Sequence, residues 1–337
     1  DMYRRAALGE SWAFAFVPII CWGLYLIISG DYKKWYVLAL GYTFMIFAHV
    51  LSTVLMAVTT VIILIIYYKP LLKEPKRIAY LFVAAAACVL LTAYYIWPMI
   101  EQLGSGQFYF QTVEPMKAQN FKMEPYRIIW GLFLGIVYPL QGFIPGVGIL
   151  LIWGVSLRLF VREKSAAMHS IDIGIIISLL FIFAQSWYFP WQVFPFNLLN
   201  FIQFPWRLNL IVSFLMAVAG GYCFYKLLIT KRRLLVGLIS VCAFIGIVLI
   251  SDGQCYNNEN NGRPLLEKPN VHNYYHIIGA EYMPSEVVSP AWLEQRGDSI
   301  ITSGNATTGS LSKNKGITLF ALSLTEQCKL ELPLVYY

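Results

Sequence analysis

The sequence is poor in charged residues and lacks the common nucleotide and hydrolase motifs. Of its 337 residues 13% are charged and 58% are hydrophobic, whereas a typical soluble domain has about 25% charged residues. It contains no P-loop, glycine-rich dinucleotide fingerprint, serine elbow or HExxH zinc motif. The composition excludes a soluble enzyme, and the missing motifs give no indication of chemistry driven by ATP or a redox cofactor. We therefore predict no certain cofactor and leave a divalent cation open.

The sequence contains many long hydrophobic runs with few charged residues. Most of them approach or exceed the length of about 20 residues that crosses a bilayer. The runs are Ser11–Ile28, Trp35–Ala48, Val50–Tyr68, Ile78–Pro98, Ile128–Leu157, Ile171–Phe189, Leu208–Ile229 and Leu234–Ile250. Trp35–Ala48 is short enough to be re-entrant or tilted, and Pro139 and Pro145 are expected to break Ile128–Leu157. The fold class that we predict is an all-α polytopic transmembrane helical bundle of about eight spans over residues 1–250.

The basic residues predict how these spans are oriented. About half of the 25 Lys and Arg residues lie in four alternate short connections, at 33–34, 69–77, 158–164 and 226–233. By the positive-inside rule these connections face the cytoplasm. The opening segment, the turn at His49, the loops 99–127 and 190–207 and the tail then face outward. The net charge of +7 reflects this orientation, so no nucleic-acid partner is predicted.

The tail from Ser251 onward has a different character. Residues 251–269 are rich in Asn, Gly and Pro, as in a loop that leaves the bilayer. Segments rich in β-formers follow, at Ser299–Thr302, Ile317–Thr325 and Lys329–Tyr337, and predict a partial extracytoplasmic β-domain over 251–337. Cys255 and Cys328 both lie in this tail, where a disulfide is chemically allowed. We expect the chain to be a fragment, because it starts on the outer side without a leader and stops within an apparent strand.

The stretch Gln203–Asn209 places Arg207 at the start of the apolar run Leu208–Ile229. The first N–H groups of a helix already carry partial positive charge, so an Arg there calls for an anionic partner. Free N–H groups beside a guanidinium would form a phosphate-binding corner. An interfacial Arg that reaches the lipid headgroups beside Trp206, in an aromatic belt, is the alternative. The sequence leaves both interpretations open.

Further polar residues lie at the predicted outer ends of the spans. Asp1, Arg4 and Arg5 would share one helical face, with Glu10 following, and a carboxylate beside two arginines suits metal or sugar-hydroxyl binding. Paired charges at an interfacial helix start, which contribute little energy, are the alternative. His49 has polar neighbours at Ser52 and Thr53, so it either bonds within the bundle or faces a site.

The aromatic loop Ser186–Pro195 is too rich in proline to continue as a span. It either dips into the membrane or forms part of an aromatic belt.

Five stretches, in order along nearly the whole chain, resemble YfhO-type bacterial membrane proteins. They are Asp1–Glu10 with Ala13–Phe16 and Pro18, Ala48–His49 with Ser52, Phe204–Arg207, Gly279–Pro284 and Leu332–Tyr337. This group overlaps membrane proteins labelled as 6-pyruvoyl-tetrahydropterin-synthase-related. Each stretch is weak alone, whereas the ordered set is more specific.

The resemblance implies a GT-C glycosyltransferase that uses a polyprenyl-phosphate sugar as donor on the outer face of the cell membrane. The acceptor would be a cell-envelope polymer or lipid. The implied catalytic residues are Asp1, Glu10 and His49, and those at the lipid phosphate are Arg207, Arg4, Arg5, Trp206 and Gln203. The family's catalytic acid usually lies in the first outer loop, which we expect upstream of Asp1. A non-enzymatic flippase or a scaffold for surface-polymer assembly is the alternative.

Overall fold

The structure is a computed structural model, and it describes most of the helical part and a short part of the tail. The described residues are 8–104, 117–134, 146–230, 234–239, 241–246, 300–308, 312–314, 317–319 and 321–331. The chain divides into two compact units, which are described separately. One unit holds Asp1–Ile96 and Met116–Gly262, and the other holds Trp97–Pro115 and Arg263–Tyr337. The domain boundary at residue 250 stays a prediction.

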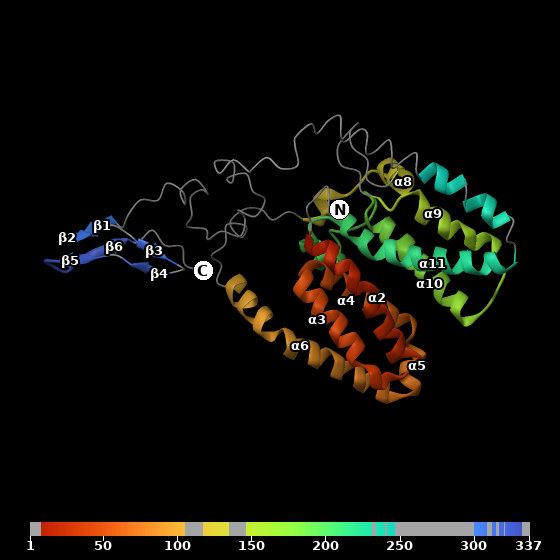
Figure 1. The fold of residues 1–337 in the computed structure, drawn as a ribbon, viewed down its shortest axis with the longest axis horizontal. Coiled ribbons are helices and arrows are strands. Elements are labelled where there is room, and N and C mark those ends of the chain that lie inside the picture. Colours follow the sequence, from red (N-terminus) through yellow and green to blue (C-terminus); the bar gives the residue numbers. More distant parts are fainter. Residues whose placement is uncertain are drawn as a thin grey trace. The chain divides into compact units, whose positions relative to one another are not determined.

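Helices make up most of the described chain (Figure 1). The α-helices are α2 (Leu8–Ile28), α3 (Tyr36–Ala48), α4 (Val50–Ile66), α5 (Tyr68–Lys73), α6 (Pro75–Gly104), α8 (Pro125–Leu134), α9 (Ile149–Ser156), α10 (Ala166–Ala184) and α11 (Asn209–Thr230). Short 3-10 helices join them: η1 (Tyr32–Lys34), η2 (Ala118–Phe121), η3 (Leu157–Phe160), η4 (Phe196–Ile202) and η5 (Pro205–Leu208). Residues 234–239 and 241–246 are also helical.

Among the described residues, four helical segments are long and apolar enough to cross a membrane. They are Leu8–Ile28, Pro75–Gly104, Ala166–Ala184 and Pro205–Ile229, of 21, 30, 19 and 25 residues. The prediction of a helical membrane protein is confirmed at this level. Helix α3 has 13 residues, which agrees with the short run predicted there, and α4 has 17. The total of about eight spans stays a prediction.

The predicted run Ile171–Phe189 is wrong at its end, because α10 stops at Ala184. Beyond it the backbone leaves the helix to pair with the segment that carries Met123. The Met123 N–H donates to the Gln185 carbonyl, and the Trp187 N–H donates to the Met123 carbonyl, both at 2.8 Å. An apolar composition extends a predicted helix through Trp187 and Phe189, whereas these cross-chain bonds end it.

Glycines allow α2 and α3 to pack closely. A methyl group on Gly23 would lie 2.6 Å from the backbone of Leu38, and one on Gly41 would lie 2.8 Å from the side chain of Ile20. Ile20 and Met45 are fully buried beside these contacts. Small residues at helix crossings are a common means of association within a bilayer, where close approach replaces the hydrophobic drive.

The predicted cytoplasmic connections meet at one end of the helices. Contacts that join helix ends there are Arg77 Nη1 to the carbonyls of Ile27 and Gly30, the Tyr67 hydroxyl to Ser170, Arg158 to Asp172, and Lys226 to Glu163. The clustering of basic side chains agrees with the positive-inside pattern. Which side of a membrane this end faces stays a prediction.

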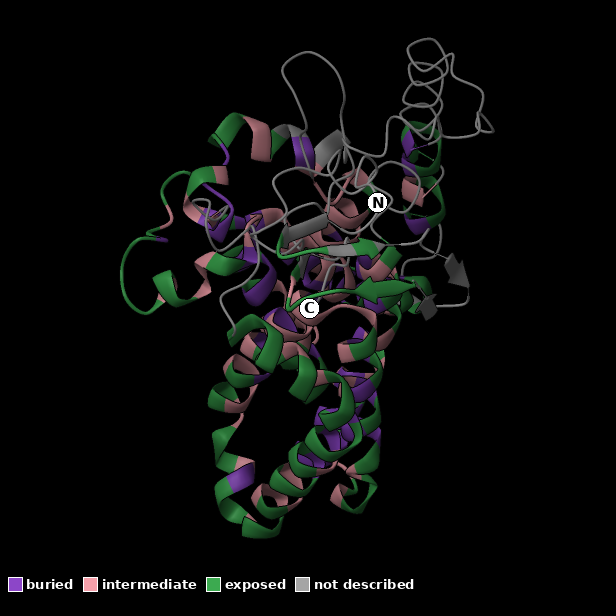
Figure 2. Ribbon diagram, turned by 90° about the vertical axis from the view of Figure 1, so that its left-hand side faces the viewer, coloured by how far each residue is buried: buried purple, intermediate pink, exposed green. Residues whose placement is uncertain are grey.

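Exposed residues lie along the outward sides of the helices, and buried ones lie where helices adjoin (Figure 2). Many of the exposed residues are large and apolar. On α6, Phe82, Leu90 and Tyr94 are 70%, 77% and 74% exposed. Such a surface would cause aggregation in water. It is the surface expected of a helix that contacts lipid.

The described residues of the tail form six short strands: β1 (Ile300–Ser303), β2 (Ala306–Thr308), β3 (Ser312–Asn314), β4 (Ile317–Leu319), β5 (Leu322–Leu324) and β6 (Lys329–Glu331). They pair antiparallel and in nested order, β1 with β6, β2 with β5 and β3 with β4. Two strands alone do not enclose a core, so the β-domain stays a prediction. Cys328 is a free thiol, and Cys255 lies outside the described residues.

Candidate functional site

The end of the bundle opposite the basic clusters contains a buried ion pair between Glu10 and Arg207. Glu10 lies in the first turn of α2, and Arg207 lies in η5 just before α11. Arg207 Nε donates to Glu10 Oε1 at 2.7 Å. The two side chains are 11% and 9% exposed, for Arg207 and Glu10 respectively. The anionic partner that the sequence called for is therefore present within the chain, and it is Glu10.

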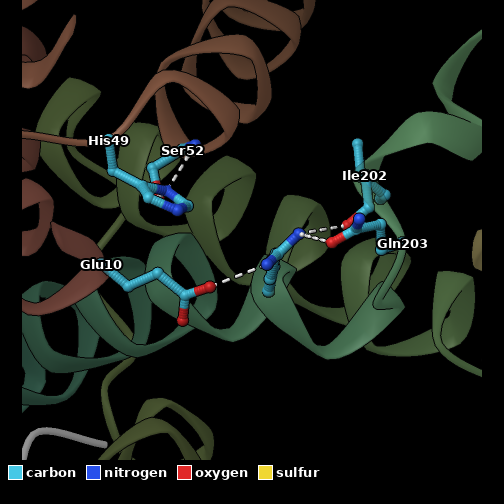
Figure 3. A network of polar contacts seen from close by, with 6 residues as sticks. Glu10, His49, Ser52, Ile202 and Gln203 are labelled. Atoms are coloured by element: carbon cyan, nitrogen blue, oxygen red, sulfur yellow. Dashed lines mark hydrogen bonds and ion pairs between the residues drawn. The ribbon is translucent and has the colours of Figure 1, made fainter. Parts of the chain in front are cut away.

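A tight turn supplies further acceptors for the guanidinium. Arg207 Nη1 donates to the Ile202 carbonyl at 2.7 Å and to Gln203 Oε1 at 3.2 Å (Figure 3). Gln203 has φ 65° and ψ −54°, and the Phe204 N–H donates to the Ile202 carbonyl at 2.7 Å. These values define a γ-turn of the rare, strained form. Strain of this kind persists where the surrounding contacts fix the chain, often at functional sites.

Aromatic rings cover the guanidinium on another side. Its carbon lies 5.1 Å from the centre of the Phe204 ring, within the range of a cation–π contact. Phe204 in turn stacks on Trp206, with ring centres 4.7 Å apart. Phe121 meets both rings edge-on. Trp206, predicted to lie at a lipid phosphate, thus belongs to the aromatic cluster beside Arg207.

His49 forms the break between α3 and α4 and caps the second helix. Its backbone is extended, and its Nδ1 accepts the Ser52 N–H at 3.1 Å and lies 2.8 Å from the Ser52 hydroxyl oxygen. The Thr53 hydroxyl donates to the His49 carbonyl. The predicted polar contacts to Ser52 and Thr53 are therefore confirmed. Because Nδ1 accepts a backbone N–H, a neutral imidazole here carries its proton on Nε2.

Gly9 brings the start of α2 against the His49 turn. A methyl group on Gly9 would lie 2.7 Å from the Ala48 carbonyl oxygen and 3.3 Å from His49 Cδ2. The start of α2 therefore lies close to the histidine, and Figure 3 shows the side chains of Glu10 and His49 near one another. Residues from three distant stretches of the sequence, near positions 10, 49 and 207, meet at this end of the helices, as predicted for Glu10, His49 and Arg207.

No protein-family model, curated protein or solved structure matches this chain. The resemblance to YfhO-type proteins therefore stays a prediction, and the roles of the site residues follow from their contacts alone. Asp1, Arg4 and Arg5 lie outside the described residues. Within the described ranges, no group of three or more His, Cys, Asp or Glu side chains is placed to hold a metal ion.

A second layer of polar contacts behind Arg207 was not predicted. Gln185 Nε2 donates to Asn209 Oδ1 at 2.8 Å, which ties the end of α10 to the start of α11. Asn200 connects to Gln119 through both its side-chain atoms. The Asn209 Nδ2 atom is buried and has no acceptor among the described residues. Polar residues at the ends of two apolar runs were the available signal, although nothing in the sequence specified their pairing.

Proposed function

We propose that this protein is a membrane glycosyltransferase that takes a sugar from a polyprenyl-phosphate donor and transfers it to a cell-envelope polymer or lipid. In this proposal the chain crosses the membrane about eight times. The end that carries Arg207 faces outward, and the tail forms an extracytoplasmic β-domain.

The observation that carries the proposal is the state of the Arg207 guanidinium. Its Nε and Nη1 atoms are held by Glu10, Ile202 and Gln203. Its Nη2 atom donates to no acceptor within the described ranges. A guanidinium that is fixed in direction on one side, and that has no acceptor for Nη2 among the described residues, suits a phosphate oxygen, which accepts strong charge-assisted hydrogen bonds.

The proposed reaction is a glycosyl transfer in which the lipid phosphate is the leaving group. An acceptor hydroxyl attacks the anomeric carbon, the new glycosidic bond forms, and the bond from that carbon to the phosphate oxygen breaks. A carboxylate takes the hydroxyl proton, and the lipid phosphate leaves with the electron pair. Arg207 stabilises the charge that develops on this phosphate. Glu10 holds Arg207 in place, and Asp1, which lies outside the described residues, is this chain's candidate for the base.

The second candidate is a non-enzymatic role in moving or assembling lipid-linked intermediates. It is favoured because Glu10 and His49, the candidate catalytic residues that the structure describes, both make structural contacts. Glu10 pairs with Arg207, and His49 caps α4. Both functions require Arg207 to bind a lipid phosphate, and they differ in whether transfer follows.

The test compares binding of a long-chain polyprenyl phosphate with binding of the polyprenol of the same length to the purified protein in detergent. The expected result is tighter binding of the phosphate. We expect Arg207→Lys to weaken that binding by about 10-fold or more, because a charged hydrogen bond contributes about 1.5–3 kcal/mol. Equal binding of phosphate and polyprenol would overturn both candidate functions.

Arg127→Lys is the matched control. Arg127 lies at the start of α8, and its side chain pairs with Glu124 and contacts Tyr126. It should bind the polyprenyl phosphate as the unsubstituted chain does. Addition of polyprenyl-phosphate hexose and membrane extract then separates the candidates, because released polyprenyl phosphate marks the transferase and its absence marks the non-enzymatic role.

A further inference from the structure

An exposed apolar stripe runs along α10 toward the end of the bundle that carries Arg207. Ile176, Leu179 and Leu180 are each 55% exposed, and Phe183 is 49% exposed. The spacing of three, four and seven residues places these four side chains on one helical face. Ile177, Phe181 and Ile182, on the other face, are buried. The helix that carries the stripe is long and apolar enough to cross a membrane, and an exposed apolar face of such a helix suits contact with lipid.

The exposed apolar side chains continue past the end of α10. Trp187 and Tyr188 are 60% and 72% exposed, although the helix has ended at Ala184. The loop that bears them is held firmly. Trp191 is 2% exposed, and its Nε1 donates to the Ala184 carbonyl at 2.8 Å. The exposed rings are therefore presented by a fixed segment of backbone.

A cation stands where the apolar stripe ends. Lys122 Nζ lies 5.4 Å from the centre of the Trp187 ring. The hydrogen bonds between Met123 and the residues around Ser186 fix this position through the backbone. Residues 186–206 contain no charged side chain. The acidic Glu124 beside Lys122 is paired with Arg127 at 3.2 Å.

This order of groups matches the order of groups in a phospholipid. Acyl chains contact aliphatic side chains, tryptophan favours the boundary between chains and headgroups, and a lysine ammonium binds phosphate oxygens. In a zwitterionic headgroup the phosphate is balanced by a cation of the same lipid, whereas the phosphate of an anionic headgroup can pair with a cation of the protein. We propose that Lys122 and Trp187 bind the headgroup of an anionic phospholipid, whose acyl chains lie along the α10 stripe.

This site is independent of the proposed transferase function and of Arg207. The probes are phosphatidylglycerol and phosphatidylcholine, presented in equal amounts to the purified full chain in nanodiscs. Native mass spectrometry then counts the lipids that remain bound after release. We expect preferential retention of phosphatidylglycerol, and an about five-fold weaker retention in Lys122→Gln, because one basic residue near an anionic surface contributes about 1 kcal/mol.

Two variants serve as controls. Lys164→Gln makes the same change in net charge at the opposite end of the bundle, where Lys164 is exposed, and it should retain phosphatidylglycerol normally. Lys122→Arg should also retain it, since the charge is kept. Equal retention of the two lipids by the unsubstituted chain would overturn the proposal. Equal losses in Lys122→Gln and Lys164→Gln would do the same, because retention would then follow net charge alone.

Tryptophan fluorescence gives a second readout. The contribution of Trp187 to the emission is the difference between the unsubstituted chain and Trp187→Phe. Phosphatidylglycerol brominated near its headgroup should quench this contribution more strongly than phosphatidylglycerol brominated at its chain ends. Stronger quenching by bromine at the chain ends would place Trp187 away from the headgroups and overturn the assignment.

Discussion

Replacement of Glu10 by Gln should destabilise the helical unit strongly, because it leaves the Arg207 charge buried without its counter-ion. The two side chains are 9% and 11% exposed, and their polar atoms lie 2.7 Å apart. Removal of one partner from a buried pair costs about 3–5 kcal/mol. Two unit charges about 4 Å apart attract by about 4 kcal/mol at an effective dielectric constant of 20. Since Ile202 and Gln203 still hold Nη1, we expect about 3 kcal/mol.

The measurement is a double-mutant cycle of the free energy of unfolding in mixed micelles. The cycle combines Glu10→Gln with Arg207→Gln. The double variant should be more stable than the sum of the single losses implies, with a coupling of about 2–3 kcal/mol, since it leaves no buried unpaired charge. A coupling within about 0.5 kcal/mol of zero, which is the usual error of additivity, would refute the claim that the pair stabilises this end of the bundle.

The pair Glu124 and Arg127 provides the matched control at the same end. These side chains are 48% and 31% exposed, so their charges are screened by water. The cycle of Glu124→Gln and Arg127→Gln should give a coupling of at most about 1 kcal/mol.

Three further predictions concern other contacts. The hydrogen bond to Lys226 lowers the pKa of Glu163. The stabilisation from this pair is therefore present above the unfolded pKa of about 4.3 and is lost as the pH falls through the folded pKa. Glu163→Gln should unfold more easily than the unsubstituted chain at pH 7 and match it in acid. Gly9→Ala should cost about 1–3 kcal/mol of unfolding free energy by steric overlap with the end of α3, whereas Gly221→Ala, with no atom within 4 Å of the added methyl, should be neutral or stabilising. Gln203→Gly should have a free energy of unfolding about 1 kcal/mol higher than that of Gln203→Ala, as measured by denaturant unfolding, because glycine relieves the strain at φ 65°.

The sequence predicted the broad class and the polar end of the helices from local patterns. Runs of apolar residues indicated helices such as α2 and α11, since composition and length determine whether a segment suits a bilayer. The position of Arg207 indicated an anionic partner. The contacts of His49 with Ser52 and Thr53 were predictable because they lie within one turn of the chain.

The features that could not be predicted from the sequence depend on contacts between distant residues. Nothing local connects Arg207 with Glu10, which lies 197 positions away. The end of α10 depends on bonds to Met123, and the fixed loop at Trp187 depends on the same bonds. The strained turn at Gln203 has no composition signal either, since positive φ values are usually found at glycine.

The long separation between Glu10 and Arg207 has a consequence for biosynthesis. A ribosome adds about 5–20 residues per second, so the 197 positions between the partners take about 10–40 seconds to translate. During that time Glu10 has entered or approached the membrane without its arginine. The first helices must therefore wait in a partly assembled state, in which water, lipid headgroups or the insertion machinery solvate the carboxylate. The arrival of η5 and α11 would then remove Glu10 from these partners and close this end of the bundle.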